Sequence, residues 1–319
     1  MARIKNLPPL NPSRARTRKL ADLSRLVRLQ DFARPHKAGA SFAQFMDSLP
    51  AVLAAADLRE LARRIARAHR TGRVFLLMSG AHPIKTGLSP LVCQLLRDGI
   101  LSAVAMNGAC IIHDFELAIA GRTSEDVGAG LGDGSFGMAR ETGEFLNQAA
   151  SIAAQEGRGL GEIVGREISR RRLKHRAISI FATAYEIGAP ATVHVAIGAD
   201  IIHMHPNADG AAIGKATLAD FHRLTQVVGS LSRGVALNLG SAVIMPEVFL
   251  KALNLCRNLG RKVRDFTTAD MDFVRHYRPR VNVVERPTGA TGGFMLTGHH
   301  EIMFPLLVAA VREELRRGA

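Results

Sequence analysis

Residues 74–90, VFLLMSGAHPIKTGLSP, contain the pattern that decides the fold. An apolar, β-rich run ends at Met78, and a segment with Gly, Pro, Lys and Thr follows it. The pair Ser89-Pro90 is typical of a helix start, with Ser89 as the N-cap and Pro90 as the first helical residue. A strand that passes through such a loop into a helix presents backbone N–H groups to an anion. We interpret this stretch as the first ligand-binding unit of an α/β domain.

Similar strand–loop–helix units continue to the end of the chain. Apolar, β-branched runs predict further strands at 103–106, 192–197, 235–239, 262–267 and 281–284. Helical segments separate these runs, and a final helix is predicted at 302–317. Such a pattern indicates parallel strands that are buried on both faces. We therefore predict an α/β fold: a Rossmann-like, doubly wound, mostly parallel sheet with helices on both faces and an N-terminal helical extension.

The composition is that of a globular protein in a reducing compartment. The chain has 319 residues, 47% of them apolar, which suffices for a large core. Its three cysteines are widely spaced and form no CxxC motif, so a disulfide framework is not expected. We find neither a signal-peptide pattern nor an apolar run of about 18 residues. A cytoplasmic location without membrane insertion is the expectation.

The charge is concentrated at the N-terminus. The net charge is +14, and residues 1–40 contain ten Lys and Arg against two Asp. We interpret residues 1–40 as a basic arm with a short helix at 18–30, and residues 41–319 as one α/β domain that begins with helices at 42–46 and 57–68. Asp57 is the expected cap of the latter helix. Only 5% of the residues are aromatic, so the basic segments lack the stacking component expected of single-strand nucleic-acid binders.

The loops after the strands are the expected ligand site, because parallel sheets bind ligands at the carboxyl ends of their strands. These loops are predicted at 80–87, 107–114, 197–209, 240–246 and 287–293. No Walker motif occurs in the chain, and the glycine-rich run at 132–137, GDGSFG, follows no predicted strand. Each glycine could serve turn geometry alone, but five such loops together favour a nucleotide crevice.

The sequence resembles the deoxyhypusine synthase family over about residues 70–310. The match is best at 105–115, AMNGACIIHDF, and continues at 85–87, 239–243 and 282–293. The resemblance implies NAD at these loops, a polyamine substrate and a homo-oligomer, a dimer or a tetramer. The cofactor-binding residues that it implies are Lys85, Thr86, Gly87, Asn107, Gly108, Ala109, Gly240, Ser241, Thr288 and Gly289.

The resemblance ends at the residues that perform the chemistry. The family's catalytic lysine is expected after the last loop, where this chain has Thr297-Gly298-His299-His300-Glu301. Imine chemistry therefore lacks its nucleophile at that position. The preferred hypothesis is an NAD-dependent transferase or oxidoreductase that acts on an amine or polyamine-like small molecule by altered chemistry.

Two clusters are candidates for catalysis. His299, His300 and Glu301 could supply a general base, or they could simply precede the last helix. His113 and Asp114 are predicted at a helix start, where they could contact a ribose or a cationic substrate. Asp114 could instead stabilise the helix dipole there.

A third cluster suggests a divalent metal. If the segment is extended, His203 and His205 point to one face, and Asp200 could join them as a ligand. Ordinary hydrogen bonding of these side chains is the alternative. Two other functions thus stay open: a metal-dependent hydrolase or transferase that uses the histidine pair, and a non-catalytic protein that binds through the basic arm.

Overall fold

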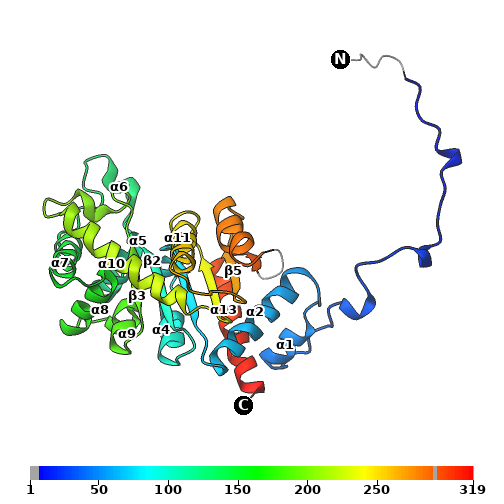
Figure 1. The fold of residues 1–319 in the computed structure, drawn as a ribbon, viewed down its shortest axis with the longest axis horizontal. Coiled ribbons are helices and arrows are strands. Elements are labelled where there is room, and N and C mark those ends of the chain that lie inside the picture. Colours follow the sequence, from blue (N-terminus) through cyan, green and yellow to red (C-terminus); the bar gives the residue numbers. More distant parts are fainter. Residues whose placement is uncertain (1–6, 290–292, 319) are drawn as a thin grey trace.

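The computed structural model describes residues 7–289 and 293–318, and its centre is a parallel β-sheet (Figure 1). The sheet has six strands over these ranges: β1 Phe75–Ser79, β2 Ala103–Asn107, β3 Ala191–His194, β4 Val235–Leu239, β5 Thr267–Asp272 and β6 Gly293–Thr297. Their order is β3-β2-β1-β4-β5-β6, and every neighbouring pair is parallel. The order reverses between β1 and β4. This topology confirms the predicted Rossmann-like, doubly wound sheet.

Helices alternate with the strands along the chain. Over the described residues they are α1 Phe42–Ser48, α2 Leu53–Arg70, α3 His82–Lys85, α4 Ser89–Arg97, α5 Gly108–Ala120, α6 Val127–Leu131, α7 Arg140–Glu156, α8 Leu160–Arg170, α9 Ile180–Glu186, α10 Gly210–Gly229, α11 Ile244–Asn258, α12 Arg286–Thr288 and α13 His300–Arg317, with a π-helical segment at Pro279–Glu285. Within that part of the chain, no helix has both the length and the apolarity to cross a membrane.

Two apolar clusters hold the helices to the two faces of the sheet. Successive side chains of a strand point to opposite faces, so Leu77 of β1 joins one cluster and Leu76 joins the other. The cluster around Leu77 includes side chains of α2, α4, α5, α7, α8, α9 and α13. The cluster around Leu76 includes α10, α11 and the π-helical segment. The strands are therefore covered on both sides, as the continuous apolar runs predicted.

The last two strands differ from the prediction. β5 begins at Thr267, where the predicted strand 262–267 ends, and its sequence TTADMD is too polar for an apolar-run pattern to detect. The predicted strand 281–284 is wrong, because these residues form a turn of π-helix that buries Val283 and Val284 against the sheet. Short apolar runs do not distinguish a buried helical turn from a strand. β6 lies at Gly293–Thr297 instead.

Several predicted helix starts are also corrected. The helix expected at 18–30 is absent; residues 20–22 and 29–31 form 3-10 turns, and the chain there extends away from the body (Figure 1). Its leucines are exposed, so no apolar surface stabilises an amphipathic helix there. α2 begins before Asp57, which removes the predicted cap. Ser89 is the first residue of α4 rather than its N-cap, because the short helix α3 occupies the preceding loop.

Candidate active site

The carboxyl ends of β1 and β4 lie at the point where the strand order reverses, which is where open parallel sheets bind ligands. Gly80 follows β1 and Gly240 follows β4. A Cβ on Gly80 would lie 2.2 Å from the carbonyl oxygen of Gly240, and Gly240 has a φ of +64°. Glycine at both positions lets the two loops approach closely. This approach forms the floor of the candidate site.

Two histidines and a carboxylate form a chain beside this floor. His82 begins α3, and its Nδ1 lies 2.7 Å from Nδ1 of His300, the first residue of α13. The Nε2 of His300 faces Oδ1 of Asp272, the last residue of β5, at 3.5 Å. His300 and Asp272 are buried, whereas His82 is exposed. The chain therefore runs from a buried carboxylate through a buried imidazole to an imidazole at the surface.

The charges along this chain suit proton transfer. Burial and the neighbouring His300 lower the pKa of His82, so His82 is neutral at pH 7 and can accept a proton. Burial alone would raise the pKa of Asp272, but the interaction with His300 and the hydrogen bond from the backbone N–H of Phe273 outweigh it and lower that pKa. Asp272 is therefore ionised and can stabilise a positive charge on His300.

An exposed aromatic ring stands over the histidine pair. Phe273 follows Asp272 and is 48% exposed. Its ring centroid lies 5.5 Å from that of His82 and 5.6 Å from that of His300. It also lies nearly parallel to the ring of His299, at 6.4 Å. Phe273 thus offers an apolar face beside the exposed end of the proton-transfer chain.

Of the three residues proposed as a general base, the structure brings one to the crevice. His300 is fully buried next to Gly240, where a Cβ would lie 2.7 Å from its ring. His299 and Glu301 have exposed side chains that face each other at 3.8 Å. Their place outside the buried chain follows from the start of α13, which turns adjacent side chains to different sides.

A small pocket adjoins the other end of α3. Its volume is about 140 Å³, and its lining includes Lys85, Ala109, His113 and Asp200, four residues that the sequence placed in the site. Burial, followed by the charge of Lys85, lowers the pKa of His113 to about 4. Burial raises the pKa of Asp200 to about 6. Glu116 and Glu125 also line the pocket, so carboxylates outnumber cations in it.

Asp200 lies against the N-terminus of α5. A Cβ on Gly108 would lie 2.0 Å from Oδ2 of Asp200, so glycine is needed for this contact. The Asp200 side chain is paired with the backbone N–H of His203 in the capping box of the 3-10 turn at 201–204. Asp200 also lines the pocket, whereas the oxygens of Glu116 accept from Thr123 and Thr142.

The predicted metal set is not assembled. Residues 201–204 form a 3-10 turn rather than a strand, so His203 and His205 do not share a face. His203 accepts at Nδ1 from the backbone N–H of Gly198, whereas Nε2 of His205 lies 2.9 Å from the carbonyl oxygen of Gly137. Over the described parts of the chain, no group of three His, Cys, Asp or Glu side chains is placed to hold a metal ion.

Asp114 is a buried structural residue in this fold. Because α5 begins at Gly108, Asp114 lies in its second turn and not at a helix start. Its carboxylate accepts from Ser179 Oγ at 2.5 Å and from the backbone N–H of Ile180 at 2.7 Å. These bonds attach α5 to the N-terminus of α9, and Asp114 is fully buried.

The remaining predicted cofactor residues lie at two opposite edges of the sheet. Ser241 lies in the crevice, and its Oγ accepts a hydrogen bond from the Met245 N–H in the first turn of α11. Asn107 is the last residue of β2, and Thr86 and Gly87 link α3 to α4. Thr288 and Gly289 precede β6, which places them at the amino edge. The prediction that they form a carboxyl-end loop is therefore wrong, and the cause is the misplaced last strand.

Three residues of the crevice were missed. His82 lies within the opening stretch, directly after the first strand, and its position alone could have indicated it. Asp272 and Phe273 could not be placed, because the strand they terminate was predicted several residues too early. A polar strand end beside a buried histidine has no signature in the local sequence.

The fold and this crevice define a Rossmann-like α/β protein with a polar site at the switch point, and solved structures share that fold. No family model and no curated protein matches the chain. A LOR/SDH protein from Methanococcus maripaludis S2, described as conserved and putative, aligns with a TM-score of 0.54 and 13% identity, over 94% of this chain and 75% of that one.

Two further similar structures are of larger proteins. AgrE, in a ternary complex with ornithine and NAD+, aligns with a TM-score of 0.54 and 11% identity, over 84% of this chain and 34% of its own. ArgZ, a cyanobacterial arginine dihydrolase, aligns with a TM-score of 0.53 and 13% identity, over 80% and 32%. The chain spans about a third of these proteins. A putative deoxyhypusine synthase from Entamoeba histolytica reaches a TM-score of 0.49, too low to assign that family. These similarities show the shared fold.

Proposed function

We propose that the chain binds NAD at the β1–β4 crevice and converts a small amine-bearing substrate there. The observation that supports this function most is the Asp272–His300–His82 chain at the switch point of a sheet whose structural relatives include an NAD+ complex. Homo-oligomer formation remains part of the proposal, since the sequence resemblance implies it.

The residues of the crevice fit a dinucleotide. Gly80 and Gly240 leave backbone without side chains at the floor. Within the described residues, the N–H groups of Ala242 and Val243 before α11 donate to no protein acceptor, so they and the helix dipole are available to a pyrophosphate. Phe273 would supply an apolar face to a ring. When bound, NAD+ supplies a hydride acceptor.

The pocket beside α3 fits the amine. Asp200, together with Glu116 and Glu125, gives it an excess of negative charge over Lys85. An ammonium group is attracted to such a set, and Asp200, whose carboxylate lines the pocket, is the side chain placed to orient it. His82 and Lys85 lie on the same short helix, so the pocket adjoins the proton-transfer chain.

The chemistry of the chain's own residues follows from this placement. His82, neutral at pH 7, accepts a proton from the substrate amine or an adjacent hydroxyl. His300 shares that proton across the 2.7 Å contact, and the ionised Asp272 stabilises the resulting positive charge. Asp272 and the buried His300 are thus positioning residues, whereas His82 is the group that would touch the substrate.

The first experiment is titration of the full chain with NAD+ by calorimetry, followed by an assay of NADH formation with small diamines and basic amino acids. Binding and amine-dependent NADH are expected. His82→Gln should retain NAD+ binding and lower the rate by about 10²–10⁴-fold. His222→Gln, an exposed histidine on α10, is the matched control and should leave the rate unchanged.

Asp200→Asn tests the amine pocket separately. We expect an increase in KM for the amine with unchanged NAD+ affinity, because the substitution removes the charge and keeps the shape. Absence of NAD+ binding to the unaltered chain would refute the function. An equal loss of rate in His82→Gln and His222→Gln would refute the role of His82.

A further inference from the structure

A second, larger hollow lies at the amino edge of the sheet, opposite the crevice. Its volume is about 660 Å³, and it is bordered by the starts of β4 and β5 and by one side of α2. Five arginines line it: Arg63, Arg64, Arg67, Arg73 and Arg233. They come from α2, from the segment before β1 and from the segment before β4. We call this the arginine pocket.

The charges of the arginine pocket are not balanced within it. The carboxylates in its lining are Glu60 and Asp265, so five guanidinium groups face two carboxylates, an excess of three positive charges. Converging charges of one sign from three chain segments repel each other. A net attraction for an anion is the consequence.

Two of the five arginines are occupied by the fold. Arg63 and Arg64 both pair with Glu60, at 3.1 and 2.9 Å. Arg64 also donates to Thr267 Oγ1 and lies over the ring of Phe294. These contacts attach α2 to β5 and β6, so Arg64 has a structural role.

The other three arginines have guanidinium groups without a protein acceptor in the described part of the chain: Arg67, Arg73 and Arg233. Arg73 is half-buried, and the other two are exposed. Each guanidinium presents donors in a planar fork that matches the oxygens of a phosphate. The arginine pocket therefore has free donors as well as free charge.

The backbone at the rim of the pocket is fixed in an unusual conformation. Arg233 has a φ of +61° and Asp265 a φ of +58°, a region that side chains with a Cβ rarely adopt. Glycine is required at the next position, because a Cβ on Gly234 would lie 2.3 Å from the carbonyl oxygen of Val74. Close packing of β4 on β1 thus holds Arg233 at the rim.

We propose that the arginine pocket binds a compact polyanion, a small molecule with two or more adjacent phosphate groups. The three free guanidinium groups converge on one hollow rather than forming a stripe, which favours a compact ligand over a nucleic-acid backbone. No aromatic side chain lines the pocket, so it lacks the stacking surface of single-strand binders. The site is independent of the crevice at the opposite edge.

The test is calorimetric titration of the full chain with inorganic tripolyphosphate, in the absence and presence of saturating NAD+. Binding is expected in both, because the two sites lie at opposite edges. The double variant Arg67→Gln/Arg73→Gln should bind about a hundredfold more weakly, since each charge-assisted contact contributes about tenfold. The control double variant Arg172→Gln/Lys174→Gln removes the same charge from exposed positions after α8 and should bind as the unaltered chain does.

Arg233→Gly provides a second variant, because glycine retains the left-handed backbone while the charge is lost. It should weaken binding by about tenfold. Failure of the unaltered chain to bind tripolyphosphate would overturn the proposal, as would an equal loss in the control double variant. Displacement of tripolyphosphate by NAD+ would assign it to the crevice instead. Tighter binding of a single-stranded oligonucleotide, lost in the double variant, would make the pocket a nucleic-acid site.

Discussion

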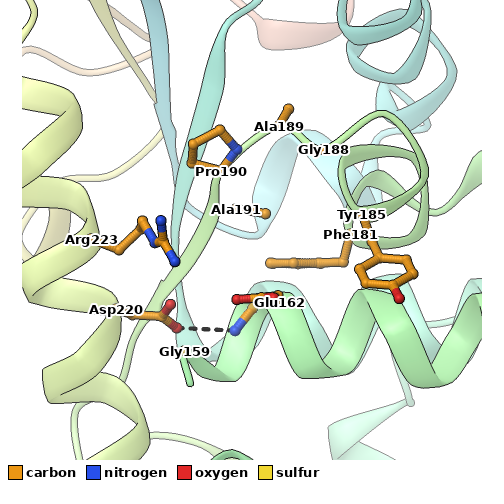
Figure 2. A pocket seen from close by; sticks show the side chains of 11 residues that line it. Gly159, Glu162, Phe181, Tyr185, Gly188, Ala189, Pro190, Ala191, Asp220 and Arg223 are labelled. Carbon is orange, nitrogen blue, oxygen red and sulfur yellow. Dashed lines mark hydrogen bonds between the residues drawn. The ribbon is translucent and has the colours of Figure 1, made fainter. Parts of the chain in front are cut away.

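Asp220 of α10 joins three elements through one buried carboxylate, and its removal should be measurable as lost stability. Figure 2 shows Asp220 beside Gly159 at a pocket of about 270 Å³. Its Oδ2 accepts from the backbone N–H of Gly161 at 3.0 Å and from that of Val193 at 2.9 Å. A Cβ on Gly159 would lie 1.9 Å from Oδ1. The carboxylate therefore links α10 to the start of α8 and to β3.

The magnitude follows from these two bonds. Asp220→Ala leaves two buried N–H groups without an acceptor, at about 1–3 kcal/mol each, so the free energy of unfolding should fall by about 2–6 kcal/mol. Asp220→Asn keeps an oxygen for both donors and should retain far more stability. Unfolding in urea, followed by circular dichroism, measures both variants.

The pH dependence gives a sharper test. Burial is the main cause that raises the pKa of Asp220 from 3.8 to about 7. The folded state keeps its proton to higher pH than the unfolded state, so this contribution to stability is complete below about pH 4 and is lost as pH rises through about 7. At 1.36 kcal/mol per pH unit, the loss over that interval is about 4 kcal/mol.

Asp220→Asn has no proton to lose at this position, so the unaltered chain should lose about 4 kcal/mol of stability relative to Asp220→Asn as pH rises from about 4 to about 7. Asp22→Asn, an exposed residue of the N-terminal arm, is the control. A difference that is constant from pH 4 to pH 8 would refute the reasoning, because the carboxylate would then titrate normally.

Three further predictions concern the crevice and its support. Asp114→Ala should lower the free energy of unfolding by about 2–5 kcal/mol in urea, because the Ser179 and Ile180 donors lose a buried acceptor; a loss below 1 kcal/mol would contradict this role. Gly80→Ala should cost about 1–3 kcal/mol and weaken NAD+ binding in calorimetry, since its Cβ would meet the Gly240 carbonyl at 2.2 Å. If Gly80→Ala binds NAD+ as tightly as the unaltered chain, the close approach of Gly80 to Gly240 does not contribute to cofactor binding. The rate of amine conversion should fall on acidification with a midpoint below pH 6.5, because burial and His300 lower the pKa of His82; a midpoint above 6.5 in the pH–rate profile would exclude His82 as the base.

The sequence predicted the sheet well wherever a strand is apolar. The segments around Val74–Met78, 103–106 and 235–239 were placed within a residue or so of β1, β2 and β4, because burial on both faces requires continuous apolar runs. β5 contains two buried aspartates among its six residues, and its polarity concealed it. The π-helical segment at Pro279–Glu285 was mistaken for a strand because it contains a short apolar, β-branched run.

The candidate site was predicted in part and for a clear reason. Gly240 and His300 could be identified because each lies at the end or the start of a recognisable element, whereas His113 lies inside α5 rather than at the predicted helix start. The metal set failed because an alternating His-Met-His pattern was assumed to be extended, and a capped 3-10 turn formed instead. The apolar residues at 18–30 failed as a helix because amphipathic periodicity requires an apolar surface to bury against.

The sequence by itself determined the class of fold and predicted which edge of the sheet carries the candidate crevice, since hydrophobic burial and turn chemistry act over short stretches of chain. Only the tertiary structure decided which polar groups meet. Residues 82, 272 and 300 are separated by as many as 218 positions along the chain, yet His82 and His300 are in hydrogen-bond contact. The same holds for the arginine pocket, where three chain segments bring their charges together. Such contacts depend on strand order and register, which long-range packing sets and no local pattern encodes.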